Sequence, residues 1–432
     1  MPLYLPSLML NLQKSLERVA FAGLGAGLGW AAWGVGRTPL LAVVFPVLLF
    51  VTRDRVAAFL CAAAYHAAVL RFMGDYVDRW FGSIFFGAAL HVALAVVCGA
   101  SWALFWTASD QRWKVAVASA SAFLMAMVPP VGMIIAGHPL FAWGFVLPPG
   151  IGWLGVVMAV MFTAAGAVAT RGLHALLPRN KAAVGLAVLA VAWVVGGVAS
   201  QQQRNPMRVA GHWVSFVTHL GEPPRTDEAV LERIEGIEAR AGGMRGGVDR
   251  ADVLVFPETS IGRYDSTYDL PLRNTLLRPA RAAGQSLVVG MELVQPDGLH
   301  NVARLYRPDG TQQTVSERQP APFSMWHPWR RDENHYPANW WGDNVLEITP
   351  GVRASVVICY EEYLPLLALI SEARGAPQVV IAMANSWAAP NDVAVAVQAT
   401  HTEGMARLFG HPVLRANNLP APRHPAAEGQ GA

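Results

Sequence analysis

Hydrophobic residues fill long runs in the first 200 residues of the chain, with few charges between them. Because a helix needs about 20 apolar residues to cross a bilayer, this pattern predicts a transmembrane helical bundle of about seven spans over residues 1–200. Two adjacent prolines, Pro129 and Pro130, interrupt the fifth run. The first two runs also fit one long tilted helix or a re-entrant hairpin. The candidate spans lie at 19–36, 38–52, 56–74, 83–107, 115–137, 151–173 and 182–199.

Beyond a polar hinge at 201–206, short apolar segments alternate with amphipathic ones. A helix is predicted at 227–241, with Thr226 as its N-cap. Strands that alternate with helices predict a layered α/β domain over 207–423, followed by a disordered tail at 424–432. The predicted strands are 212–218, 253–256, 286–291, 352–358 and 379–383, with further helices at 273–283 and from 360 to 374 and a hairpin turn at 307–310.

The positive charge of the chain belongs to its first half. Residues 1–200 hold 12 Lys or Arg against 5 Asp or Glu, whereas 21 Arg and no Lys face 25 acidic residues from 201 onward. The net charge of +3 therefore does not indicate a nucleic-acid partner. With a cytoplasmic start, nine basic residues fall in inside loops and three in outside loops, as the positive-inside rule predicts for seven spans. This orientation places the protein in a bacterial inner membrane with its C-terminal domain in the periplasm, and an even number of spans reverses it.

Two reactive side chains follow predicted strands in the second half of the chain. Glu258 lies in the sequence VFPETS, and Cys359 lies in VVICYE. Because the carboxyl ends of parallel strands open onto one cleft, we expect the carboxylate and the thiol to meet there. A thiol beside a base is typical of covalent acyl chemistry. Each residue also fits a structural role, Cys359 as a core side chain and Glu258 as a helix cap.

These motifs, in this order, resemble the carbon–nitrogen hydrolase (nitrilase) superfamily. The likeness rests on FPET, ICYE, ANSW at 384–387 and the segment 405–418 ending in LRANN, and it covers roughly 207–420. Within the superfamily the chain is most similar to the membrane-bound apolipoprotein N-acyltransferases, which also place such a domain after a bundle of spans. A related family, the conjugal-transfer proteins of Ti-type plasmids, has the same layout, and the stretch RQPAPFSMW at 318–326 is similar to it. The resemblance implies a nitrilase-like αββα sandwich.

The resemblance also implies a catalytic triad of Glu, Lys and Cys. In this chain Glu258 matches the general base and Cys359 the nucleophile. Glu361, two residues after the thiol, matches a carboxylate found there in the acyltransferases. We therefore assign catalytic roles to these three residues as an expectation.

The lysine of that triad has no counterpart, because no Lys follows Lys181. The segment that leads to the ProPhe pair at 322–323 offers Glu317 and Arg318 instead. Arg318 is the candidate replacement, since a guanidinium can donate hydrogen bonds to an oxyanion, although it cannot carry a proton between groups. A surface or ion-pair role is the alternative for this residue.

A Trp-rich stretch at 323–341 is a candidate for contact with the substrate, with Trp326 as the predicted residue. This stretch suits either a loop resting on the bilayer surface or a packed lid over the cleft. Asn385 and Asn417 are predicted to contact the substrate or to order their loops. The eight His after residue 201 show no spacing typical of a metal site, so neither a metal nor a cofactor is predicted.

Two functional hypotheses follow from these observations. In the first, the chain is a membrane-bound enzyme that transfers or hydrolyses an acyl group through a Cys359 thioester. Its acyl donor is then a membrane lipid, and a protein or peptide amine is the acceptor. In the second, the domain is catalytically degenerate and acts as a binding or assembly protein in conjugative plasmid transfer or envelope biogenesis.

Overall fold

The computed structural model describes residues 5–176, 212–246, 250–330 and 334–420. The chain divides into two compact units, each described below by itself. The helical unit contains Met1–Pro206 together with two later segments, Tyr363–Leu366 and Pro390–Gly410. The sheet unit contains Met207–Glu362, Leu367–Ala389 and His411–Ala432. The predicted hinge at 201–206 and the predicted tail at 424–432 lie outside the described residues.

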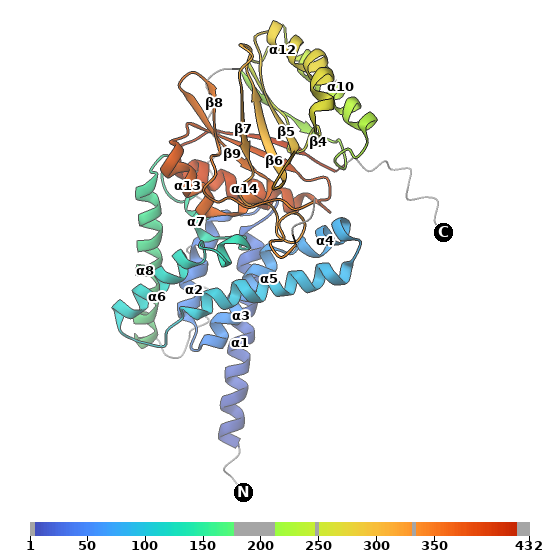
Figure 1. The fold of residues 1–432 in the computed structure, drawn as a ribbon. Coiled ribbons are helices and arrows are strands. Elements are labelled where there is room, and N and C mark those ends of the chain that lie inside the picture. Colours follow the sequence, from blue (N-terminus) through green and yellow to red (C-terminus); the bar gives the residue numbers. More distant parts are fainter. Residues whose placement is uncertain (1–4, 177–211, 247–249, 331–333, 421–432) are drawn as a thin grey trace. The chain divides into compact units, whose positions relative to one another are not determined.

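Helices of very different length make up the helical unit (Figure 1). Its first helix packs against its third at two glycines, because a Cβ at Gly25 or Gly29 would lie 2.1 or 2.4 Å from a backbone oxygen of α3. Such close backbone contact through small residues is typical of helices within membranes. The elements are α1 (Leu5–Ala32), η1 (Pro39–Val44), α2 (Phe45–Val51), α3 (Arg55–Val69), α4 (Met73–Phe81), α5 (Ile84–Leu104), α6 (Arg112–Met125), η2 (Val131–Met133), α7 (Pro139–Trp143), α8 (Trp153–Leu176) and α14 (Asp392–Phe409).

The structure does not confirm seven membrane spans. Within the described residues, α5 and α8 are long and apolar enough to cross a bilayer, and the bent pair of α3 and α4 makes a third candidate. The run at 38–52 forms only the short apolar helix Pro39–Val51. The run at 115–137 is broken as well, since α6 ends at Met125 ahead of the two prolines. The seventh predicted span, 182–199, lies outside the described residues.

The segment containing α14 comes late in the sequence but packs within the helical unit. Its buried residue His401 accepts a hydrogen bond from the backbone N–H of Gly137 at 2.8 Å. The other ring nitrogen of His401 donates to the carbonyl of Val397, so the proton lies on Nδ1. The ring stacks on Trp33, with centroids 4.5 Å apart, and meets Phe141 edge-on. These contacts fix α14 to the N-terminal helices.

Two β-sheets form the centre of the sheet unit. The first runs in the order β1, β3, β5, β6, β7, with β4 beside β5, and the second runs β2, β11, β10, β9, β8. The chain passes from one sheet to the other at Phe216, whose N–H bonds Val255 while its carbonyl accepts from Asn417. The strands are β1 (Trp213–Ser215), β2 (Val217–Thr218), β3 (Val253–Val255), β4 (Arg263–Tyr264), β5 (Ser286–Gln295), β6 (Gly298–Tyr306), β7 (Gln312–Ser316), β8 (Val345–Thr349), β9 (Val352–Ile358), β10 (Val379–Asn385) and β11 (Val413–Asn418).

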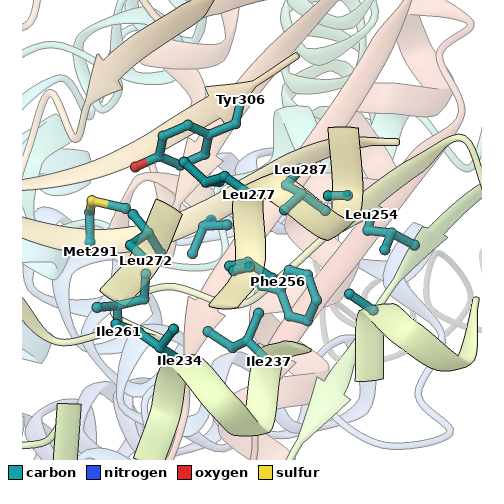
Figure 2. Close-up of a cluster of buried hydrophobic side chains, with 14 of the residues drawn as sticks. Ile234, Ile237, Leu254, Phe256, Ile261, Leu272, Leu277, Leu287, Met291 and Tyr306 are labelled. Carbon is teal, nitrogen blue, oxygen red and sulfur yellow. The ribbon is translucent and has the colours of Figure 1, made fainter. Parts of the chain in front are cut away.

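The two sheets enclose one apolar core between them, and the first sheet forms a second core with helices. Alternate residues of β3, such as Val253 and Val255, point into the core between the sheets, where they join residues such as Val356 and Ile381. Figure 2 shows the second core, where Leu254 and Phe256 meet the helix α10. The helices of this unit are α10 (Asp227–Gly243), α11 (Asp269–Leu272), the π-helical turn η5 (Arg273–Leu277), α12 (Arg278–Ala282), the turns η4 (Ser266–Tyr268) and η6 (Cys359–Tyr363), and α13 (Pro365–Gly375).

The predicted α/β character of this half is confirmed, and several elements match their predicted bounds. Thr226 caps α10 by accepting from the N–H of Ala229. A hairpin joins β6 and β7 at the predicted turn. On the second sheet, the side chain of Asn344 donates to Val356 of β9 and to Ser371 of α13, which places α13 beside that sheet. The strand β8 and the helix α14 were not predicted.

Candidate functional site

The site is built where strands of both sheets end. Glu258 follows β3, Cys359 follows β9, and Asn385 is the last residue of β10. β3 pairs in parallel with its neighbours in the first sheet, and β9 pairs in parallel with β10 in the second. Glu317 follows β7 by one residue. The site thus combines three reactive side chains and an amide, each at or just beyond the carboxyl end of a strand.

Strained or crowded backbone turns hold Glu258 and Cys359, the two residues that match the family motifs. Cys359 and Thr259 both have positive φ angles, 47° and 48°, which are strained for residues with a Cβ. Gly290 of β5 makes room for the Glu258 turn, because a Cβ there would lie 2.3 Å from the Pro257 oxygen and 2.6 Å from the Glu258 Cα. The turn at Cys359 presents its sulfur at the end of a buried strand, as nucleophile turns do.

Cys359 and Glu258 meet as the sequence predicts. Their side chains hydrogen-bond to each other, and the backbone of Asn385 hydrogen-bonds to both. Glu258 is 4% exposed, and burial raises the pKa of its carboxyl group from the usual 4.5 to about 7. A carboxyl group with such a pKa can take or give a proton near neutral pH.

A second carboxyl group, Glu317, lies at the third corner of the site. The side-chain N–H₂ of Asn301 donates to Glu258 Oε1 at 2.6 Å and to Glu317 Oε2 at 2.9 Å, so one amide bridges the two acids. Burial raises the pKa of Glu317 well above its usual value, and the charges of Glu258 and Glu361 raise it further. Burial, followed by the charges of Glu258 and Glu317, also raises the pKa of the Cys359 thiol well above its usual 9.0. The neighbours of the sulfur are therefore acidic.

The side chain of Arg318, the predicted cation, bonds with Glu361 and with a backbone carbonyl. Its Nε atom lies 3.3 Å from Glu361 Oε1, and its Nη1 atom donates to the carbonyl of Leu367. Glu361 also accepts from the backbone N–H groups of Arg318 and Ile358, at 2.6 and 3.1 Å. The carboxylate thus joins the residue after Glu317 to the residue before Cys359. Glu361 therefore positions the site and neutralises the charge of Arg318.

The asparagines order the loops around the site. Asn385 donates through its side chain to Thr259 and accepts from Asn418. Asn417 accepts from the N–H of Ser386. The side chain of Asn418, which was not predicted as a site residue, bonds with four groups: the Gly221 carbonyl, the Leu220 N–H, the Thr218 hydroxyl and the Asn385 side chain. These contacts support the loop-ordering role.

Trp326 lies in a tight loop just beyond Gln319. Its backbone N–H donates to Ala321, and its carbonyl accepts from Phe323, whose φ angle is 69°. The nearby Trp340 donates from its ring nitrogen to Gln319 at 2.7 Å, whereas Trp329 and Trp341 are 67% and 71% exposed. Part of the stretch is thus packed and part faces outward, and the contact of Trp326 with a substrate stays a prediction.

Two residues that complete the site, Asn301 and Glu317, were not predicted as site residues. Glu317 stands directly before Arg318, and only its position one residue past the end of β7 points to the site. Asn301 lies inside β6 with no motif around it. Among the described residues, no cluster of His, Cys, Asp and Glu has the geometry of a metal site.

Comparison with known proteins agrees with this architecture. The family model "Carbon-nitrogen hydrolase" matches residues 212–424. The conjugal transfer protein TraB of Agrobacterium fabrum (strain C58) is 27% identical over 410 residues, covering 91% of each chain. The probable conjugal transfer protein TraB of Sinorhizobium fredii is 26% identical over 414 residues, covering 94% of this chain and 99% of that protein.

Among solved structures, a CN-hydrolase superfamily protein from Xanthomonas campestris matches 48% of this chain and 74% of its own, at 18% identity and a TM-score of 0.35. Its crystal structure carries an arsenic adduct in the active site. The family assignment rests on the sequence match, which spans the strands that deliver Glu258, Glu317 and Cys359. Residues 212–424 form a domain that matches the carbon–nitrogen hydrolase family model, in a chain similar to the TraB conjugal transfer proteins.

Proposed function

We propose that this protein acts in conjugal plasmid transfer as a membrane-anchored binding protein whose hydrolase-like site rests in a non-nucleophilic state. The observation that carries the proposal is Glu317. It places a second buried carboxyl group beside Cys359, at the corner of the site where the resemblance implies a lysine. The role in plasmid transfer is suggested by the TraB relatives, which match nearly the whole chain.

The charges around the sulfur argue against spontaneous acyl transfer. The thiol has a pKa well above 9.0 and its partner Glu258 has a pKa of about 7, so transfer of the proton from sulfur to carboxylate is unfavourable by more than about a hundredfold. A developing oxyanion would also meet the carboxyl group of Glu317 instead of a cation. Loss of one oxyanion donor typically slows catalysis by about a hundredfold or more. Both effects favour binding over turnover.

Acylation of the thiol tests the resting state directly. The full chain in detergent is incubated at pH 7 with a fluorescent activated ester, and labelling at Cys359 is measured by peptide mass spectrometry against the Cys359→Ala variant. We expect no labelling of the folded wild type above that background, and clear labelling of Glu317→Lys. Rapid acylation of the wild type would refute the resting state.

Plasmid transfer tests the biological role. A donor strain lacking the gene is complemented with wild type, Cys359→Ala or an empty vector, and the transfer frequency is counted. We expect Cys359→Ala to restore transfer to within a few-fold of wild type, because binding does not require the sulfur. A frequency equal to that of the empty vector, with normal protein levels, would show that the thiol chemistry is required.

Acyl transfer is the second candidate function, and the Cys359–Glu258 hydrogen bond favours it. In this reaction Glu258 takes the thiol proton, the sulfur attacks the acyl carbonyl of a membrane lipid, and the protonated Glu258 returns the proton to the leaving alcohol. A protein or peptide amine then attacks the thioester, forming an amide and restoring the thiol. The acylation experiment separates this candidate from the first.

We propose an inner-membrane location with the sheet unit in the periplasm. The apolar helices α5 and α8 support membrane insertion, and the excess of Lys and Arg in the predicted inside loops supports the orientation. An alkaline phosphatase fusion after residue 420 is expected to be active, because that enzyme folds only outside the cytoplasm. An inactive but stable fusion would place the domain in the cytoplasm.

A further inference from the structure

Three buried oxygen atoms at the centre of the site lack hydrogen-bond partners. They are Glu258 Oε2, Glu317 Oε1 and Asn301 Oδ1, and their residues are 4%, 4% and 2% exposed. The three belong to one constellation, because the Asn301 amide bonds to the other oxygen of each carboxyl group. A buried acceptor without a partner costs about 1–3 kcal/mol, and more when it is charged. The constellation is therefore short of hydrogen-bond donors.

Arg318, the cation next to Glu317 in the sequence, is engaged by other groups, although its Nη2 atom has no hydrogen-bond partner among the described residues. Arg318 is held by Glu361 and by the Leu367 carbonyl. Glu292, a further acid near Glu258, accepts from Tyr336 at 2.7 Å. The described partners that bond with or electrostatically affect the two bridged acids are the Asn301 amide, the Cys359 thiol, the Asn385 backbone and further acids.

We propose that this constellation binds the ammonium group of a primary amine ligand, such as a lysine side chain or the N-terminus of a peptide. An ammonium group has three N–H donors and no acceptor, which matches three unpaired acceptors of which two are carboxyl oxygens. Charge-assisted hydrogen bonds of this kind are about twice as strong as neutral ones. This inference rests on the proposed binding role, and it names the chemical class of the ligand.

The bound ammonium also changes the thiol. A positive charge within about 4–6 Å lowers the pKa of an acidic group by about 1–3. The charges of Glu258 and Glu317, which raise the pKa of Cys359, are then partly offset by the single positive charge of the ligand. The amine supplies the charge that the protein lacks, so Cys359 becomes more nucleophilic when the ligand is present.

Alkylation of Cys359 tests this inference. The full chain in detergent is treated with iodoacetamide at pH 7.5, and the rate at Cys359 is followed by peptide mass spectrometry. Methylammonium chloride is varied at constant ionic strength, with tetramethylammonium chloride or sodium chloride as the balance. We expect a saturable rise of about tenfold or more with methylammonium. Tetramethylammonium carries the same charge without N–H donors and is expected to have no effect.

Variants locate the effect. Glu317→Gln should lose the response to methylammonium, whereas Glu235→Gln, at an exposed position on α10, should keep it. Glu317→Lys should react rapidly without any amine. Equal responses to methylammonium, tetramethylammonium and sodium, or an unchanged response in folded Glu317→Gln, would overturn the inference.

A second measurement separates the amine site from the thiol chemistry. In the Cys359→Ser variant, methylammonium should still raise the thermal unfolding temperature, since a ligand stabilises the state it binds. The absence of this shift refutes the amine site whatever the result of plasmid transfer. A positive shift together with a normal transfer frequency for Glu317→Gln refutes instead the role of the site in transfer.

Discussion

The two bridged carboxyl groups make a quantitative prediction about stability and pH. Glu258 holds its proton more tightly in the folded chain, with a pKa of about 7, than in the unfolded chain, where 4.5 is usual. The stabilising contribution of the protonated group is therefore complete below pH 4.5 and is lost as the pH rises through 7. Each pKa difference of one corresponds to about 1.4 kcal/mol, so Glu258 alone should cost the folded state roughly 3 kcal/mol at pH 9 relative to pH 4.5.

Substitution of Glu258 isolates this contribution from other titrating groups. Glu258→Gln keeps the size of the side chain and cannot ionise. At pH 5 its stability should be close to that of the wild type, or lower, because wild-type Glu258 is mostly protonated there. At pH 9 the variant should gain on the wild type by up to about 3 kcal/mol, or roughly 5–10 °C in unfolding temperature. Glu317→Gln should gain in the same direction, since burial also raises the pKa of Glu317.

Intrinsic tryptophan fluorescence provides the assay, because the chain contains 15 Trp. Thermal unfolding of the detergent-solubilised chain is recorded at half-unit steps from pH 5 to 9 for the wild type, both variants and Glu235→Gln as the exposed control. The informative quantity is the difference between each variant and the wild type as a function of pH. Differences that stay constant across the range would show that neither carboxyl group holds a displaced proton, and the reasoning about the resting site would fail with them.

Two further predictions concern packing. Gly290→Ala should destabilise the fold by about 1–3 kcal/mol, because the new Cβ would lie 2.3 Å from the Pro257 oxygen. The control Gly236→Ala on α10, where no atom lies nearer than 3.5 Å, should not destabilise it. Equal unfolding temperatures for the two variants would contradict this prediction. His401→Ala should destabilise the chain by about 3 kcal/mol or more, since it leaves the Gly137 N–H without its acceptor and removes a ring stacked on Trp33. The control is His300→Ala, at a partly exposed position, measured by the same unfolding assay. A loss of stability no larger than that of this control would argue against the prediction.

The placement of Glu258 and Cys359 could be predicted from the sequence because it depends on strand order. Glu258 follows β3, which pairs in parallel with β5, and Cys359 follows β9, which pairs in parallel with β10, so both side chains lie at carboxyl ends of parallel strands. The choice between Glu317 and Arg318 could not be predicted in this way. Adjacent residues in an extended segment point to opposite sides, so a shift of one residue decides which side chain reaches the thiol. In the structure Glu317 faces Asn301 and Arg318 faces Glu361.

Hydropathy alone predicted more spans than the described residues show, because it does not reveal where a helix ends. The run at 115–137 is apolar throughout, yet α6 stops at Met125 and the following prolines prevent its continuation. The position of α14 was unpredictable for a related reason. Its contacts with the helical unit depend on single groups, such as the Gly137 N–H and the ring of Trp33, that lie more than 260 residues away in the sequence.

The site combines features that are costly unless a ligand compensates for them. Cys359 adopts a positive φ angle, which costs about 1–3 kcal/mol, in a turn of the kind that exposes a nucleophile. Glu361 holds the backbone on both sides of the site, so the strained turn and the Glu317 corner are fixed to each other. The turn at Cys359 thus suits a nucleophile, while the nearby carboxyl groups raise the pKa of its thiol and so reduce its reactivity. A cationic amine resolves this conflict, because it pairs with the unbonded oxygens and reduces the negative field at the sulfur in a single binding step. The same event stabilises the fold and activates the thiol, so the two effects should appear at the same concentration of amine.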